Sequence, residues 1–92
     1  MDISEYLDVC SDLRHQIADY DNKILELLET RIDLSKDLIK IKLSQNQNAY
    51  DPIVEDKKLE TLCAQTAYPD LVKIIWPLIM LYCRASEGLN EN

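Results

Sequence analysis

The chain has 92 residues, a formal net charge of −7, one glycine and three prolines. So few turn-forming residues favour a few long helices over a sheet, and an acidic chain without a basic block is unsuited to nucleic acid or to an anionic membrane surface. Three cysteines without CxxC spacing and a single histidine argue against a disulfide framework and against a zinc or other metal site. They favour reduced thiols in the cytoplasm.

The first half of the chain carries an apolar stripe with helical spacing. Apolar residues recur at steps of three, four and seven, and no glycine or proline interrupts residues 1–51. We predict one helix over residues 5–44, roughly 60 Å long at 1.5 Å per residue. A compact domain of this size is only roughly 26 Å across, so the helix needs a partner helix, most simply from a second copy of the chain. The stripe consists of Leu7, Cys10, Leu13, Ile17, Tyr20, Ile24, Leu27, Leu28, Leu34, Leu38 and Ile41.

A polar loop and a second helix follow. Residues 45–51 are mostly polar and predict a loop. Pro52 suits the first turn of a helix, Asp51 suits its N-cap, and Glu55 lies in its first turns. We expect this helix over residues 52–66.

The last helix is predicted over residues 70–87, after a short turn at Pro69. Gly88 occupies the position just past the end, where a left-handed residue often terminates a helix. Pro77 falls inside the helix and removes one backbone donor, so we expect a kink there. The sequence therefore predicts an all-α chain of three helices in a single domain, residues 1–92, that pairs with a second copy as a homodimer.

Three cations lie among the apolar positions of the long helix. Arg31 and Lys42 are eleven residues apart, which places them within about 20° of one face and roughly 16 Å apart along the axis, so both could reach a small dianion. Arg14 lies about 25 Å up the helix from Arg31 and about 100° around it, so it could meet the same ligand only from a partner chain. The alternative is that all three are ordinary cations beside a dimer seam.

The sequence around these cations resembles the first helix of the all-helical, AroQ-type chorismate mutases. The family pattern LRxxIDxxDxxILxLLxxR, with a lysine eleven residues later, corresponds to the segment from Leu13 to Lys42. Residues 49–55 (AYDPIVE) resemble the family's V-x-D-P-x-R-E, and residues 75–87 resemble its closing F-x-x-I-x-x-x-S-x-x-x-Q. The resemblance covers roughly residues 10–88.

The resemblance implies an intertwined dimer with two equivalent sites, and the rearrangement of chorismate to prephenate in the shikimate pathway of aromatic amino acid biosynthesis. This Claisen rearrangement is pericyclic, so it needs no nucleophile, metal or cofactor. The enzyme must hold the substrate in a reactive chair and stabilise negative charge on the ether oxygen.

The resemblance also implies roles for individual residues. Arg31 and the partner's Arg14 would bind the substrate carboxylates, and Lys42 would serve the ether oxygen and a carboxylate. Glu55 and the backbone at Asp51 would hold the ring hydroxyl. Both acidic residues have a simpler alternative role, because Asp51 suits an N-cap and Glu55 suits the start of a helix.

Glu87 stands where the family more often has a glutamine that donates a hydrogen bond to the ether oxygen. An ionised carboxylate would repel the developing charge, so Glu87 would act with its pKa raised by burial and its carboxyl protonated. The alternative is a solvated glutamate in the last turn of the helix.

Departures from the family pattern at Val54, Cys83 and Pro77 bear on the site. Val54 replaces the second-helix arginine, which removes a cation from a carboxylate-binding site. Cys83, expected to bind substrate by its position, replaces the usual serine and is a weaker donor. Pro77 is also atypical and could shift the helix end that carries Cys83.

Three other functions remain open. The first is an isochorismate-pyruvate lyase, which uses the same cationic cage, although Glu55 favours chorismate or its amino analogue over isochorismate. The second is an aminodeoxychorismate mutase, whose substrate is that amino analogue. The third is a non-catalytic helical dimerisation module, which the missing arginine would suit.

Overall fold

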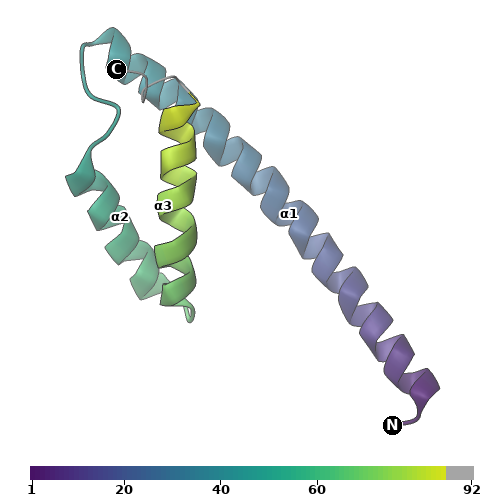
Figure 1. Ribbon diagram of the computed structural model, residues 1–92. Coiled ribbons are helices and arrows are strands. Elements are labelled where there is room, and N and C mark those ends of the chain that lie inside the picture. The colour runs from purple at the N-terminus through teal and green to yellow at the C-terminus, as the bar shows by residue number, and fades with distance from the viewer. Residues whose placement is uncertain (87–92) are drawn as a thin grey trace. The chain divides into compact units, whose positions relative to one another are not determined.

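The computed structural model describes residues 1–86. It has three α-helices in chain order, α1 (Ile3–Ser44), α2 (Pro52–Gln65) and α3 (Pro69–Ala85), and no strand within residues 1–86 (Figure 1). The all-α fold with one long and two short helices is confirmed. None of these helices is both long and apolar enough to cross a membrane.

The chain divides into two compact units, Met1–Arg31 and Ile32–Asn92, with the boundary inside α1. The first unit is the N-terminal part of α1. The helix begins after Asp2, whose Oδ1 accepts a hydrogen bond from the Glu5 backbone N–H at 2.8 Å and so satisfies one of the free donors of the first turn. No side chain of Met1–Arg31 is buried. Most of the apolar stripe is exposed there, for example at Ile24, which is 60% exposed, while Cys10 and Leu28 are half-buried.

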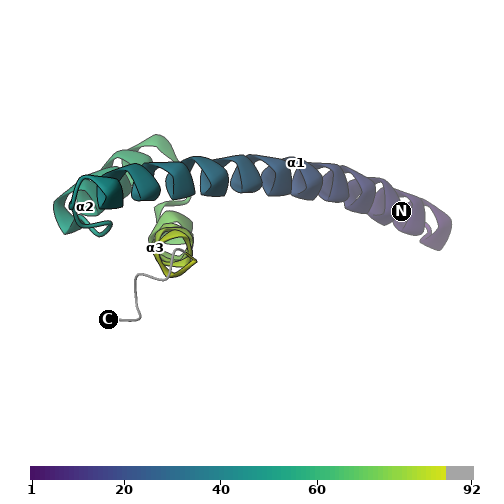
Figure 2. The ribbon, with the colours of Figure 1, turned by 90° about the horizontal axis from the view of Figure 1, so that it is seen from above.

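In the second unit, α2 packs against α3 (Figure 1). Figure 2 views α3 nearly along its axis. The apolar side chains that are buried within residues 32–86 come from the end of α1 and from α3. They are Ile39, Val72, Met80 and Cys83.

The link between α1 and α2 is built by local backbone chemistry. Asn46, just after α1, has φ 57°, a left-handed conformation that asparagine tolerates better than most residues. The N–H of Gln47 then donates to the Lys42 carbonyl at 2.8 Å, which satisfies an acceptor of the last helical turn. The predicted loop after Ser44 is confirmed.

The ends of α3 show where sequence rules are least exact. Pro69 stands at the first helical position, as proline's fixed φ favours, so the helix begins one residue earlier than predicted. It continues through Pro77 as one helix and ends at Ala85 rather than near residue 87. The hydroxyl of Ser86 donates to the Cys83 carbonyl at 3.0 Å, a local bond that competes with further helix. Glu87 and Gly88 lie outside the described residues.

Candidate functional site

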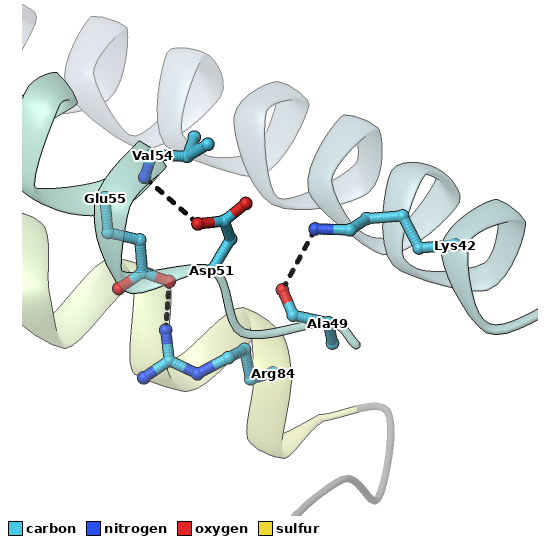
Figure 3. A network of polar contacts seen from close by, with 6 residues as sticks. All are labelled: Lys42, Ala49, Asp51, Val54, Glu55 and Arg84. Atoms are coloured by element: carbon cyan, nitrogen blue, oxygen red, sulfur yellow. Dashed lines mark hydrogen bonds and ion pairs between the residues drawn. The ribbon is translucent and has the colours of Figure 1, made fainter. Parts of the chain in front are cut away.

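A polar cluster surrounds the start of α2 in the second unit (Figure 3). Lys42, in the last turn of α1, is partly buried, and its Nζ donates to the Ala49 carbonyl at 3.4 Å. Ala49 lies in the loop that leads into α2. This contact holds the lysine ammonium beside the loop, with other N–H donors still available on a group that has three.

Asp51 is the N-cap of α2, as predicted. Its Oδ1 accepts a hydrogen bond from the Val54 backbone N–H at 3.2 Å, and Pro52 occupies the first turn. The carboxylate therefore serves the helix start, where the helix dipole also favours a negative charge. The sequence resemblance implied a ligand contact by the backbone at this position, and that contact stays a prediction.

Glu55 forms an ion pair that was not predicted from the sequence. Its Oε2 accepts from Nη1 of Arg84, near the end of α3, and the two side chains are 22% and 17% exposed. The carboxylate is thus used to join two helices, and no capping contact by the Glu55 side chain is seen. The guanidinium also lies over the ring of Tyr50, with 4.4 Å from Cζ to the ring centroid.

Arg84 gave a weak signal in the sequence, because a cation in the last turn of a helix is adequately explained by the helix dipole. A stronger signal was the valine at position 54. It leaves Glu55 without the neighbouring cation of the family pattern, and this vacancy could have prompted a search for another cation near Glu55.

Cys83, next to Arg84, is buried with 2% of its surface exposed. It is a free thiol. Burial of this kind is what a small apolar core residue shows, so the simpler role as a core residue accounts for it in the isolated chain. Val54, by contrast, is 59% exposed.

The structure brings together only some of the expected site residues. Lys42, Asp51 and Glu55 gather at the start of α2 (Figure 3). Arg14 and Arg31 belong to the first unit, where Arg14 is exposed and Arg31 is partly buried with an interaction partner of its own. The expected contribution of Glu87 lies outside the described residues.

The chemistry available in the second unit is ionic and hydrogen-bonding. The cluster combines two cations, Lys42 and Arg84, with two carboxylates, Asp51 and Glu55. Within residues 1–86 no three His, Cys, Asp or Glu side chains are grouped to hold a metal ion. Such a cluster can bind and orient a small polar anion, and its ammonium and guanidinium groups can stabilise negative charge.

The single histidine has a local role in the first unit. Nδ1 of His15 lies 2.8 Å from the Ser11 carbonyl, one turn earlier on the same helix. The side chain is exposed. His15 therefore bonds to its own helix in this unit.

Comparison with known families agrees with the resemblance noted in the sequence. No curated protein and no solved structure matches the chain. The family model of chorismate mutase type II matches residues 13–88, which is most of the chain and includes the long helix from Leu13 onward, α2 and α3. The chain belongs to the chorismate mutase type II family.

Proposed function

We propose that this protein is a chorismate mutase that rearranges chorismate to prephenate. The observation that carries the proposal is the convergence of Lys42, Asp51 and Glu55 at the start of α2 (Figure 3). These are three positions at which the family pattern places substrate contacts, and family membership supports a chorismate-like substrate. Lys42 lies in α1, Asp51 is the N-cap of α2 and Glu55 lies in α2, so their convergence depends on the loop that joins the two helices.

The reaction needs a cage of cations and one hydrogen-bonding site for the ring. In this proposal the Lys42 ammonium binds the ether oxygen and a substrate carboxylate, and it stabilises the charge that develops as the C–O bond breaks. Glu55 accepts from the ring hydroxyl through Oε1, since Oε2 is paired with Arg84. Arg31 and the partner's Arg14 bind the carboxylates, and the carboxyl of Glu87 donates to the ether oxygen in its protonated form.

The proposal includes a homodimer, because no side chain of the first unit is buried by the chain itself. Its exposed apolar side chains include Leu13, Ile17, Ile24 and Leu27, which are 52% to 71% exposed. Removing one such side chain from water contributes about 1.5–3 kcal/mol, so a second copy packed along the stripe would contribute many times that amount. In this arrangement residues 1–92 act as one domain that the partner completes.

The cytoplasm is the proposed location. All three cysteines, Cys10, Cys63 and Cys83, are free thiols, which suits a reducing compartment.

The test is to incubate the purified protein with chorismate and, separately, with isochorismate, from mildly acidic to neutral pH, and to resolve the products by chromatography. We expect prephenate from chorismate, and we expect Lys42→Met to lower its rate by at least about 100-fold. Lys40→Met removes an exposed cation two residues away and serves as the matched control.

Other outcomes would change the assignment. Pyruvate and salicylate from isochorismate alone would identify a lyase with the same fold. Turnover of neither substrate, in a protein with native helical circular dichroism, would contradict the proposal and favour a non-catalytic helical module.

A further inference from the structure

We propose that Arg84 is a substrate-binding residue, and that it supplies from α3 the carboxylate-binding cation that the family pattern places at position 54 of α2. This inference rests on the proposed function, since it names a further residue of the same site. It depends on three features of the second unit: the Glu55–Arg84 ion pair, the position of Tyr50 and the side chain at Val54.

The guanidinium of Arg84 is held in place from two directions. Glu55 binds its Nη1 from α2 (Figure 3). The ring of Tyr50, in the loop before α2, lies under the guanidinium face, with 4.4 Å from Cζ to the ring centroid. With both charged side chains about four-fifths withdrawn from solvent, much of their hydration is lost. A partly buried ion pair of this kind is a poor source of stability, because desolvation offsets the attraction. Stabilisation of the α2–α3 contact alone is therefore a weak reason for placing an arginine here.

The geometry leaves the arginine able to bind a second anion. A guanidinium has five N–H donors on three nitrogens, and the Glu55 ion pair engages Nη1. Another edge of the same plane can bind a carboxylate through two parallel hydrogen bonds, which an ammonium group cannot do. Stacking on Tyr50 fixes the plane of the fork in advance, so less side-chain entropy is lost when the ligand binds.

The charge balance of the cluster gives Arg84 a purpose. Val54 precedes Glu55 directly, and as valine it brings no charge. Without Arg84, this cluster would hold one cation, Lys42, and two carboxylates, Asp51 and Glu55. Its net negative charge would repel a substrate with two carboxylates. Arg84 neutralises this negative charge and reaches Glu55 from α3, so α3 supplies the cation that α2 lacks.

The test moves the cation between the two helices. We would measure kcat and KM for chorismate, and chorismate and isochorismate binding by titration calorimetry, with the full chain. The variants are Arg84→Met, Arg84→Lys, Val54→Arg and the double variant Val54→Arg/Arg84→Met. Lys73→Met, which removes an exposed cation from the same helix, is the matched control.

Loss of a charge-assisted, bidentate contact predicts that Arg84→Met lowers kcat/KM by about 10-fold to 100-fold, mainly through KM. Arg84→Lys should recover only part of this loss, because it keeps the charge without the fork. Adding Val54→Arg to Arg84→Met should raise kcat/KM by at least about 10-fold. The same substitution in the wild type should change kcat/KM by less than about threefold, since the two positions serve one carboxylate. Lys73→Met should stay within about twofold of the wild type.

Two results would overturn the inference. The first is a folded Arg84→Met or Arg84→Lys protein whose kcat/KM and ligand affinity stay within about twofold of the wild type, even if its Tm is lowered. That result is expected when the ion pair is purely structural. The second is a loss in Arg84→Met that Val54→Arg does not restore. If Arg84→Met does not fold, Arg84→Lys and the double variant decide by the same criteria.

The binding measurement separates this inference from the proposed function. If the wild type binds either dicarboxylate without converting chorismate, the mutase assignment fails, and weaker binding by Arg84→Met still supports the role of Arg84. If the wild type binds neither compound, both proposals are wrong.

Discussion

The two units of the chain differ in where their side-chain contacts lie. In Met1–Arg31 the hydrogen bonds of Glu5 and His15 each span about one helical turn, and so does the contact of Lys23 with the Tyr20 ring at 4.8 Å. From Ile32 onward, local contacts are joined by contacts between separate elements. Lys42 contacts the following loop, and Arg84 contacts both α2 and Tyr50, the residue before the N-cap of α2. The second unit therefore specifies its polar cluster from within the chain.

The first unit has the opposite character. Most of its apolar stripe is exposed and no side chain is buried, so packing within Met1–Arg31 does not explain why the helix should persist. Isolated helices are held mostly by packing of their apolar face rather than by propensity. Under the proposed function this difference amounts to a division of roles: residues 32–86 would hold the polar cluster, and the exposed stripe of the first unit would pack against a second copy.

The largest expected effect comes from breaking the first unit. Ile24→Asp puts a charge into the middle of the stripe and should abolish the dimer and nearly all mutase activity, because burial of an unpaired carboxylate costs several kcal/mol per chain. Sedimentation velocity and the prephenate assay measure both losses. Asn22→Asp adds the same charge about 200° around the helix and is the control. A dimer that survives Ile24→Asp would show that the stripe is not the interface.

An intermediate effect is expected at the end of the chain. If Glu87 acts as a protonated carboxyl, activity is present at acidic pH and falls as the pH rises and the group ionises, by up to about tenfold per pH unit. Glu87→Gln cannot ionise, so its kcat/KM should be nearly independent of pH from mildly acidic to neutral conditions. Glu60→Gln, at an exposed position on α2, should keep the wild-type profile. Parallel profiles for Glu87→Gln and the wild type would rule out this role.

The smallest effect compares the two helix starts. Asp51 and Asp2 each accept a backbone hydrogen bond, at 3.2 Å and 2.8 Å. Asp51→Ala should lower the free energy of unfolding by about 1 kcal/mol, because α2 is packed and cannot fray without losing its contact with α3. Asp2→Ala should lower it by only a few tenths of a kcal/mol, since the start of α1 is exposed and can fray alone. Urea denaturation compares them, and equal losses would show that the two helix starts are equally coupled to the rest of the fold.

The sequence was sufficient for the helices because their signals are local. An uninterrupted stripe with helical spacing predicted α1, and Asp51 followed by Pro52 predicted both the cap and the first turn of α2. The ends of α3 were predicted less exactly, because the helix begins at Pro69 rather than residue 70 and ends at Ala85 rather than near residue 87.

The contact between Glu55 and Arg84 could not be predicted in the same way. The two residues are 29 positions apart, and their meeting depends on how α2 packs against α3. Each residue alone had an adequate local explanation, as a charge near a suitable helix end. The family pattern gave only an indirect guide, because the valine at position 54 indicates that a cation is missing from α2 but not where another one lies.

The most direct test of the divided roles is complementation between two inactive variants. Arg14→Met and Lys42→Met should each lose most activity as homodimers. When equal amounts are unfolded together and refolded, half of the dimers are mixed, and each mixed dimer has one site with both cations, so about one quarter of the wild-type activity should return. Absence of recovery, with mixed dimers demonstrated by mass spectrometry, would contradict the account, because it would mean that Arg14 does not act in the site of the partner chain.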